Sequence, residues 1–527
     1  MHHSSTVEVP AVKDLSRIAA ENNPDKVAFG NGVDGETMTW REFDERSNQA
    51  ANAFKQYVGQ GDRVALLCEN SMEHTVLWNG GLKAGCTVSN LHIRASANTL
   101  QHCIDSLRPK VLVVDEETSE MYEERLKDKI TTDVDVVVNT GSAMTDYEVG
   151  MDPFLDGHSR AEPDVRVREE DTAVVMWTSG TTGEPKGWCH TNRGLYFRAN
   201  ALVSVYELNR PARQPHVFTP SFAAWYSVVL PALVSGATTY FLRSWDPEDY
   251  LEMIQEHDLT SALLVPTMWR EILNLENFDD YDLSSLTAIM SAGEVLDATT
   301  LRRLRENICD VVKNSYAATE AYATVMENAE LTEERVESVG KPVPGVEIRI
   351  VDEDGTYRDV KPTGEVGEIV VRAPDCPVWA WERTDKTEDV FEDGWWYSGD
   401  LGYRDEDGFI YLEGRTDLMI MSKGIKVYPS PIEERLNAHP GVNESAVVGV
   451  EDEEYGEKVT AYVYRDDPDL TAEELDEWCL ESDDLARMER PREYHFVDES
   501  LPRTSTGKLD RLSAKNENLD VTTEDVE

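Results

Sequence analysis

The chain has 527 residues, a length typical of about two to four domains with a large hydrophobic core, which excludes a small binding module as the whole protein. Its 102 Asp and Glu residues outnumber its 50 Lys and Arg residues and give a formal net charge of -52. Nucleic acid and anionic membrane surfaces are therefore poor partners, because both would be repelled.

Acidic clusters recur along the whole chain, as in Asp352-Glu353-Asp354 and Glu451-Asp452-Glu453-Glu454, so the charge belongs to a surface and not to one acidic tail. Such a surface repels itself in dilute buffer and is tolerated where salt screens it, since the Debye length is about 3 Å at 1 M salt. We interpret the composition as that of a protein from a halophilic cytoplasm. The alternative is an acidic mesophilic protein.

The cysteine pattern and the N-terminal residues indicate the cellular compartment of the protein. The 7 cysteines are an odd number without a C-x-x-C pair, which favours neither a disulfide framework nor a zinc site. The start, Met1-His2-His3-Ser4-Ser5, has no basic or apolar signal region, and no stretch approaches the roughly 18 apolar residues of a membrane span. We expect a soluble cytoplasmic protein with no membrane span, and the sequence leaves a homodimer open.

In chain order, short apolar segments alternate with helical patterns. Apolar strands separated by helices predict an α/β fold of mainly parallel sheets flanked by helices. From about Gly340 the strands alternate with Gly and Asp turns, which predicts an antiparallel β subdomain. The expected strands are 63–67, 110–114, 260–265 and 286–290, and the expected helices are 40–57, 192–206, 247–256 and 298–306.

A small second domain is predicted after Gly414-Arg415-Thr416-Asp417. The remainder is about a hundred residues long, an ordinary size for an α+β domain, with a helix expected at 431–438 and a strand at 445–450. We therefore place a large N-terminal domain at 1–416 and a C-terminal domain at 417–527. The final residues, 516–527, are expected to form a frayed acidic tail.

A run of hydroxyls and glycines lies between Trp177 and Trp188, after a strand expected at 172–177. Glycines let backbone amides converge on an anion, hydroxyls add donors and a lysine adds a compact charge, so the run indicates a polyphosphate loop. The P-loop spacing does not fit, because two residues separate Gly183 from Lys186 and Gly187 stands where a Ser or Thr is needed. A flexible surface turn is the alternative. The loop residues are Thr178, Ser179, Gly180, Thr181, Thr182, Gly183 and Lys186.

Two later segments combine the groups that a nucleotide needs. Residues 314–320 contain an aromatic ring that can stack on a purine, a threonine that can donate to a phosphate and a carboxylate that can hold magnesium. Residues 397–402 contain an aspartate, and Arg415 follows; a carboxylate and an arginine together can grip a ribose. The alternatives are a strand end with a polar turn, and a turn aspartate beside a surface arginine.

Five segments resemble the motifs of the acyl-adenylate-forming superfamily and follow the same order along the chain. They are 178–187, 314–320, 397–402, 414–429 and 502–508. That superfamily includes acyl-CoA synthetases, luciferases and the adenylation domains of nonribosomal peptide synthetases. Ala317 replaces the glycine of the Y-G-x-T-E motif, and Leu418 replaces the acidic residue common after the hinge. The match is specific from Thr178 to Lys508 and weaker before Thr178.

The resemblance implies a role for each matching position. Asp400 and Arg415 would hold the ribose, Asp417 would be the hinge of the C-terminal domain, and Lys508 would bridge the substrate carboxylate and ATP. The other nucleotide or coenzyme positions are Gly293 and Glu294 beside adenine, Asn314, Ser315, Tyr316, Thr319, Lys423, the backbone at Gly424 that the thiol approaches, and Lys426 at the adenylate phosphate.

The segment 219–226 resembles the P-x-F-H stretch at the family's acyl pocket, with Ala223 in place of the histidine. This implies that Phe222, Ala223, Trp225 and Ala318 line the pocket. Trp225 and Tyr226 either shorten the pocket or are core aromatics, and the sequence leaves both interpretations open.

The resemblance thus implies an ATP-dependent acid:CoA ligase that uses Mg²⁺ and coenzyme A and activates a carboxylic acid, expected to be a fatty acid, through an acyl-adenylate. Thr178, Glu320 and Lys508 would be catalytic, with Glu320 as the magnesium ligand. One alternative is a stand-alone adenylation enzyme that loads a carrier protein. Another is a non-enzymatic nucleotide-binding regulator, against which the joint presence of Glu320, Asp400 and Lys508 argues.

Overall fold

A computed structural model describes residues 9–33, 35–178, 185–206, 208, 212–327, 329–353, 355–423, 425–452, 454–465, 468–482, 485–503, 509–516, 519 and 521–526. The chain packs as two compact units, which we call the first unit (Met1–Ile348 with Val371–Trp396) and the second unit (Arg349–Val370 with Tyr397–Glu527). The domain boundary expected after residue 416 stays a prediction about where the C-terminal domain begins.

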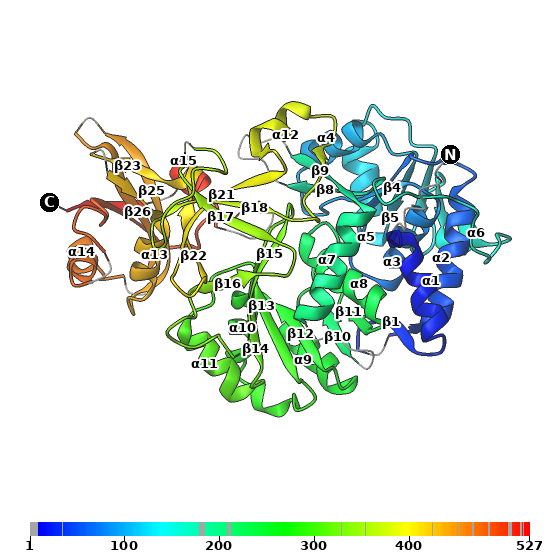
Figure 1. The fold of residues 1–527 in the computed structure, drawn as a ribbon, viewed down its shortest axis with the longest axis horizontal. Helices are drawn as coiled ribbons and strands as arrows, with labels where there is room; N and C mark the ends of the chain where they lie inside the picture. The colour runs from blue at the N-terminus through cyan, green and yellow to red at the C-terminus, as the bar shows by residue number, and fades with distance from the viewer. Residues whose placement is uncertain are drawn as a thin grey trace. The chain divides into compact units, whose positions relative to one another are not determined.

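The largest sheet of the first unit is mostly parallel, as the apolar runs predicted (Figure 1). The inner strands 111–114 and 136–139 are buried along their length, which explains why nearly all of their side chains are apolar. At one end, β9 and β19 add antiparallel pairs. The strand order is β19 (Trp379–Ala380), β9 (Lys186–Thr191), β8 (Thr172–Thr178), β4 (Thr87–Asn90), β3 (Arg63–Leu67), β5 (Val111–Val114), β6 (Val136–Asn139) and β7 (Glu148–Gly150).

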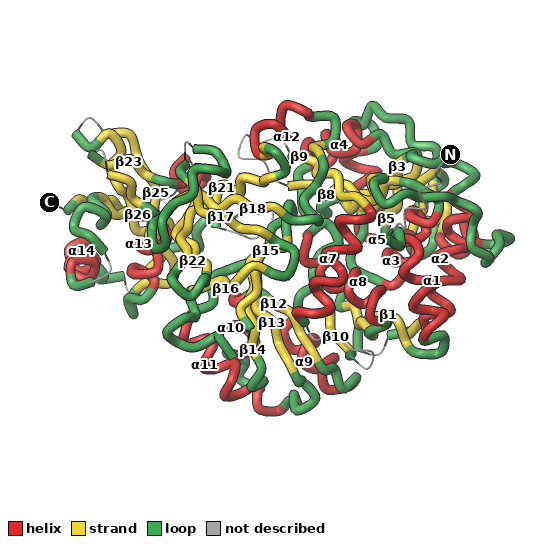
Figure 2. The backbone as a smooth tube through the Cα atoms, viewed as in Figure 1, coloured by secondary structure: helices red, strands yellow, loops and turns green. Residues whose placement is uncertain are grey.

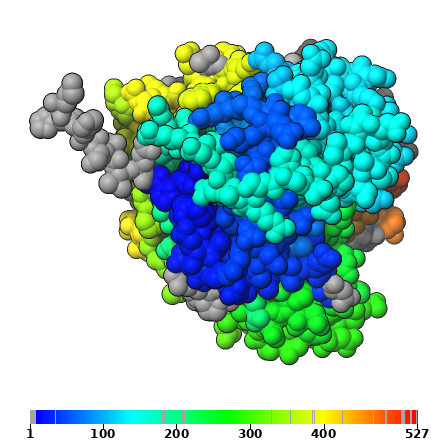
Figure 3. Space-filling view, turned by 90° about the vertical axis from the view of Figure 1, so that its right-hand side faces the viewer, coloured from blue at the N-terminus to red at the C-terminus, as the bar shows by residue number. Residues whose placement is uncertain are grey.

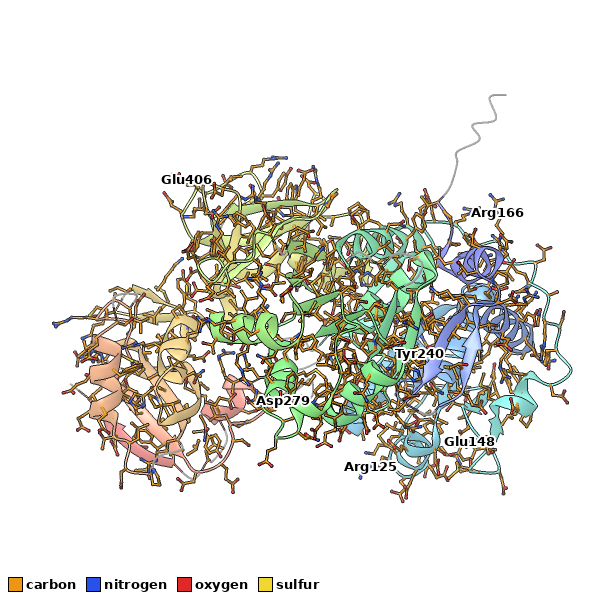
Figure 4. The ribbon with its side chains drawn as sticks, turned by 90° about the horizontal axis from the view of Figure 1, so that it is seen from below. Arg125, Glu148, Arg166, Tyr240, Asp279 and Glu406 are labelled. Atoms are coloured by element: carbon orange, nitrogen blue, oxygen red, sulfur yellow. The ribbon has the colours of Figure 1, made fainter. Side chains whose placement is uncertain are left out.

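Two further sheets complete the strands of the first unit. The aromatic ring of Tyr240, labelled in Figure 4, belongs to one of them and stacks on His257 with 3.8 Å between ring centres. That sheet has the order β10 (Arg213–His216), β11 (Thr238–Phe241), β1 (Val27–Asn31) and β2 (Thr37–Thr39). The other contains β12 (Ser261–Leu264), β13 (Ala288–Ala292), β14 (Val312–Ala317), β15 (Tyr322–Met326) and β16 (Ser338–Pro342) in that order.

Helices cover these sheets, as Figure 2 shows for α1, α2 and α3, which lie side by side. Their starts follow local capping rules: Thr39 and Glu42 form a reciprocal capping box at α2. The helices of the first unit are α1 (Val12–Asn22), α2 (Trp40–Phe54), α3 (Met72–Lys83), α4 (Ala97–Leu107), α5 (Glu116–Met121), α6 (Met151–Leu155), α7 (Asn192–Val205), α8 (Ala223–Ser235), α9 (Pro247–Glu256), α10 (Pro266–Leu273), α11 (Ala298–Asn307) and α12 (Thr384–Val390).

A long connection before β8 packs onto the N-terminal helices. In Figure 3 the N-terminal residues, in blue, lie beside the cyan part of the chain. Asn52 on α2 donates from Nδ2 to the carbonyls of Ser159 and Ala161, at 2.8 and 2.9 Å. The connection contains no helix or strand, and these bonds attach it to α2.

The second unit holds a group of neighbouring strands and an α+β region. The group contains β17 (Glu347–Val351), β18 (Gly367–Arg372), β21 (Trp395–Arg404) and β22 (Ile410–Arg415), and β21 pairs antiparallel with β22. β20 (Phe391–Glu392) belongs to the first unit, where it pairs with Trp395 and Trp396. The α+β region contains β23 (Ile420–Ser422), β24 (Ile425–Val427), α13 (Pro429–Asn437), β25 (Val442–Asp452), β26 (Gly456–Arg465), α14 (Ala472–Leu480), β27 (Glu493–Val497), α15 (Arg511–Asn516) and β28 (Val521–Asp525).

The α/β fold expected from the sequence is confirmed, including every strand and helix named above, with ends displaced by a few residues at most. The expected frayed tail is wrong: β28 pairs antiparallel with β27 from Val497↔Val521 to Glu493↔Asp525. Its acidic residues hid the strand, because Asp and Glu are uncommon in strands and only the pairing with β27 reveals it. Among the described residues, no helix is both long and apolar enough to cross a membrane.

Three histidines are buried in the core of the first unit and are expected to make the fold sensitive to acid. Burial lowers the pKa of His74 to about 4, and lowers those of His190 and His216 to about 3. An unfolded histidine titrates near 6.5, so the unfolded chain binds more protons below that pH. Their contribution to stability is present above pH ~6.5 and is lost as the pH falls toward the folded values.

We predict that His216→Leu flattens the loss of unfolding free energy between about pH 6.5 and pH 5. Neither ring nitrogen of His216 has a hydrogen-bond partner among the described residues, and the ring packs near Phe218, Trp225 and Phe241. An apolar replacement therefore removes the titration at small cost. Chemical denaturation at both pH values measures the slope, and a variant slope equal to that of the wild type would contradict the assignment.

Candidate active site

The predicted polyphosphate loop joins two paired strands of the first unit. β8 ends at Thr178 and β9 begins at Lys186, and these two residues face each other in the antiparallel register. The indole N–H of Trp188 donates to Oγ1 of Thr178 at 3.2 Å, which leaves the threonine hydroxyl hydrogen to donate elsewhere. The tip of the loop, with Ser179, Gly180, Thr181, Thr182 and Gly183, lies outside the described residues.

Two other predicted segments meet at the carboxyl ends of parallel strands. β13 and β14 lie side by side (Figure 1), with Ser291 opposite Asn314 and Ala292 opposite Ser315. β13 then turns through Gly293, whose φ of +88° lies in the region that favours glycine. The expected adenine-side segment and the 314–320 segment are therefore neighbours, at the sheet edge where α/β proteins bind ligands.

Side chains at this edge are already engaged with the fold. The carboxylate of Glu294 accepts from the amide and the hydroxyl of Thr267, at 3.0 and 2.7 Å. Asn314 is buried, and its Oδ1 accepts from the amide of Ser315 at 3.0 Å. These contacts give Glu294 and Asn314 a structural role at this edge, in addition to their expected contact with a nucleotide.

After β14 the chain makes a tight turn, closed by the amide of Ala318 donating to the carbonyl of Ala321 at 2.8 Å. The turn holds Thr319 and Glu320, and these residues, like Tyr316 before them, are partly exposed. The described residues contain no cluster of three metal-ligating side chains. Magnesium bound to a nucleotide needs only one or two protein carboxylates besides phosphates and waters, so a single carboxylate at Glu320 fits that ion.

A buried ion pair that the sequence reasoning missed grips this turn. Arg198 on α7 donates from Nε to Oδ2 of Asp375 at 2.9 Å, and the two side chains are 1% and 0% exposed. Arg198 Nη2 also donates to the carbonyls of Ala318 and Thr319, at 3.4 and 3.0 Å. Asp375 Oδ2 accepts in addition from the amide of Tyr322 at 2.9 Å.

A sequence signal for Arg198 existed. Leu195, Arg198, Ala199 and Leu202 follow the spacing of one helix face, and all four are buried. An arginine among apolar residues on such a face predicts a buried partner, because a lone buried charge is too costly. Nothing in the sequence marked Asp375 as that partner, since 177 residues separate the two.

The acyl segment divides between core and surface. Trp225 is fully buried, donates from Nε1 to Oδ1 of Asn70 at 3.0 Å, and packs against Trp78 with 5.1 Å between ring centres. These contacts favour the interpretation of Trp225 as a core aromatic. Phe222 and Ala223 are partly exposed at the start of α8 and stay candidates for the acyl pocket, as does Ala318.

In the second unit, the two residues assigned to the ribose form a pair. Asp400 on β21 faces Arg415 on β22, and Arg415 Nη1 donates to Oδ1 of Asp400 at 2.8 Å. Gly399 has a φ of +71°, a region that favours glycine, and a Cβ there would lie 3.1 Å from Nη2 of Arg415, so glycine leaves room for the guanidinium. Arg415 also donates from Nε to Oδ1 of Asp417 at 3.0 Å. The expected sugar and hinge residues are thus linked through one arginine.

The basic residues expected at the thiol and phosphate groups are paired with carboxylates. Lys426 contacts Glu353 at 2.6 Å. Lys423 contacts Glu454 at 2.7 Å and lies over the ring of Tyr455, and the pair raises the pKa of the lysine. Gly424 lies outside the described residues.

Lys508 also lies outside the described residues, but its flanks are anchored. Arg503 and Leu509 form an isolated antiparallel bridge. Arg503 pairs with Glu444 at 2.6 Å, and Arg511 donates from Nε to Glu433 at 2.7 Å. Ion pairs on both sides therefore fix the stem of the segment that carries Lys508.

Comparison with known proteins identifies the family to which this chain belongs. Residues 16–376 match the AMP-binding enzyme family, and residues 431–508 match the AMP-binding enzyme C-terminal domain. The long-chain-fatty-acid–CoA ligase of Yersinia pestis is 30% identical over an alignment that covers 96% of this chain and 94% of that protein. The 3-hydroxybenzoate–CoA/4-hydroxybenzoate–CoA ligase of Thauera aromatica is 28% identical over 486 residues, covering 91% of this chain and 92% of that protein.

A solved structure extends the similarity to three dimensions. The o-succinylbenzoate CoA synthetase from Bacillus subtilis, in complex with its acyl-adenylate intermediate, superposes with a TM-score of 0.84 at 26% identity. The superposition covers 98% of this chain and 99% of that one. The family match spans more than half of the chain, and the protein is therefore a member of the AMP-binding enzyme family, as the order of its motifs along the chain predicted.

Proposed function

We propose that the protein is an ATP-dependent acid:CoA ligase. The observation that carries the proposal is the in-register meeting of segments 291–294 and 314–320 at the carboxyl ends of β13 and β14, with the Thr319–Glu320 turn directly after it. The Yersinia, Thauera and Bacillus relatives are all named as CoA ligases or synthetases, which supports the same activity here.

In the first half-reaction, an oxygen of the substrate carboxylate attacks the α-phosphorus of ATP and pyrophosphate leaves. No general base is needed, because a carboxylic acid is already ionised at neutral pH. Thr178, Lys186 and the loop between them would hold the departing phosphates, and Lys508 would stabilise charge between the carboxylate and ATP. A magnesium ion held with the help of Glu320 would neutralise phosphate charge.

In the second half-reaction, the coenzyme A thiol attacks the acyl carbonyl of the adenylate, and AMP leaves as the thioester forms. Asp400 and Arg415 would keep the nucleotide in place through both steps. The C-terminal domain would turn about Asp417, withdrawing Lys508 and bringing Gly424 to the thiol. One site would thereby perform two reactions in sequence.

Release of pyrophosphate with a panel of acids tests this proposal. We propose a fatty acid as the substrate class, with an aromatic acid as the competing class, because the relatives include ligases for both. The panel should pair fatty acids of increasing length with benzoates, each with and without coenzyme A. No acid-dependent release of pyrophosphate from any member would overturn the ligase proposal.

The competing function is the loading of a carrier protein. The match of relatives named as CoA ligases over more than nine-tenths of the chain favours coenzyme A as the acceptor. Supplying the adenylated enzyme with coenzyme A or with a phosphopantetheinyl carrier protein distinguishes the two. Faster acyl transfer to the carrier would favour the alternative.

We predict that Asp417→Pro spares adenylation and slows thioester formation. Asp417 lies in a short 3-10 turn at Thr416–Leu418, and a proline fixes φ near -65° where the hinge must rotate. Asp417→Ala is the control, because it removes the contact with Arg415 without restricting the backbone. Measured by separate half-reactions, a normal thioester rate in Asp417→Pro would remove this residue from the hinge.

We also propose that the acidic surface is an adaptation to salt and that the enzyme works in a cytoplasm rich in salt. Among the described residues, only Asp44, Asp115, Glu148, Glu368, Asp375 and Glu433 are buried acids. Most acidic side chains in the described part of the chain are therefore at least partly exposed to solvent, where mobile ions can screen their charge.

A further inference from the structure

We propose that Arg198 and Asp375 are positioning residues that set the Thr319–Glu320 turn for the magnesium–nucleotide complex. This inference rests on the proposed ligase function. It concerns two residues that contact the backbone of the turn, and neither is assigned to contact the substrate.

The contacts of the pair converge on one short segment. Arg198 binds the carbonyls of Ala318 and Thr319, and Asp375 binds the amide of Tyr322, so both ends of the turn are held. The bond between Arg198 and Asp375, at 2.9 Å, joins the two holds into one. A guanidinium is planar and rigid, so the bond of Arg198 to Asp375 and its two bonds to the turn carbonyls fix the turn in orientation as well as in place.

The pair is costly, which argues for a role beyond packing. Two charged groups that are almost fully buried lose their hydration, and a well-packed apolar pair of similar volume is often as stable or more stable. The second carboxylate oxygen of Asp375 is also buried, with no hydrogen-bond partner among the described residues. Precise placement of a ligand-bearing turn gives such a pair a function, since a displacement of about 1 Å in a site can cost roughly 10²-fold in rate.

The approach of Asp375 to α7 is built into the local sequence. Gly194 lies in the first turn of α7, and a Cβ there would lie 3.2 Å from the carbonyl of Pro374 and 3.3 Å from Cα of Asp375. Glycine at 194 thus lets the 374–375 segment come close enough for Asp375 to reach Arg198.

Arg198→Lys is the first test, because it keeps a cation beside Asp375 and removes the fork that holds two carbonyls. We expect acyl-adenylate formation, measured by pyrophosphate release, to fall by about 10²-fold. The Mg²⁺ concentration for half-maximal rate should rise by about tenfold, because the turn that carries Glu320 is no longer fixed. Transfer of a supplied acyl-adenylate to coenzyme A should stay within about threefold of wild type, since that step needs no pyrophosphate or magnesium grip.

The double variant Arg198→Met/Asp375→Leu is the second test, because it removes both charges of the pair and so leaves no unpaired charge buried at this position. We expect it to keep its unfolding midpoint and to show the same defect in Mg²⁺ response. The control is Lys83→Met/Asp44→Leu, which removes another buried pair of the first unit, with 2.8 Å between Lys83 Nζ and Asp44 Oδ1. That control should leave the Mg²⁺ response unchanged.

The outcomes separate this inference from the function on which it rests. If wild-type enzyme releases no pyrophosphate with any acid, the ligase proposal fails. If wild type is active and either Arg198 variant, once corrected for its folded fraction, keeps a normal Mg²⁺ response, the pair is structural only and the inference is wrong. A Mg²⁺ defect of equal size in the Lys83 control would overturn it as well.

Discussion

Replacing Lys508 with alanine is expected to slow acyl-adenylate formation by about 10²–10³-fold, the usual cost of losing one preorganised charge-stabilising donor. Transfer of a supplied acyl-adenylate to coenzyme A should continue, because the proposed cycle withdraws Lys508 before that step. Pyrophosphate release measures the first half-reaction, and thioester formation from added adenylate measures the second.

The anchoring of the flanking chain makes this a sharp test. The bridge between Arg503 and Leu509 and the Glu433–Arg511 pair hold the stem independently of Lys508, so the substitution should not disturb the fold. Lys515→Ala on α15 is a matched control: that lysine donates to the carbonyl of Gly449 at 2.7 Å and has no proposed catalytic role. Equal loss of both half-reactions in Lys508→Ala would indicate misfolding or another role.

The fold was predictable where local pattern and burial agree. The 3.6-residue period of α9 predicts a helix, and the apolar runs of β3 and β5 are too short for a helix, which favours strands. The structure places all three within a residue of the expected ends. β28 was missed because an acidic run resembles a tail, and only its pairing with β27 makes it a strand. Such long-range pairing leaves little trace in a local pattern.

The candidate site was predictable in its motifs and not in its supports. Asp400 and Arg415 were named from the sequence, and their pairing across β21 and β22 followed only from the register. The grip of Arg198 and Asp375 on the 318–322 turn joins three distant parts of the chain. Motifs record the groups that meet a ligand, whereas the groups that hold those motifs are dispersed and become visible only in three dimensions.

Salt is expected to stabilise the protein strongly, for reasons that come from composition and burial and not from the family. The formal net charge is -52, and among the described residues only six Asp and Glu side chains are buried. The folded state therefore concentrates negative charge at its surface, and the unfolded chain spreads it out, so repulsion favours unfolding in dilute buffer. Raising KCl from about 0.1 M to about 2 M shortens the Debye length from about 10 Å to below 3 Å and should relieve that repulsion.

The measurement is the thermal unfolding midpoint without ligands, because activity alone is ambiguous. ATP and coenzyme A are anions, so salt would also screen their repulsion from the protein and could raise activity through binding. We expect the midpoint to rise by several degrees or more, since each kcal/mol is worth about 2–4 °C in a domain of about 150–250 residues. Sucrose in place of KCl is the control, because it favours compact states without screening charge. A midpoint as high in 0.1 M as in 2 M KCl, or an equal rise in sucrose, would show that surface repulsion does not limit stability and that the composition is not an adaptation to salt.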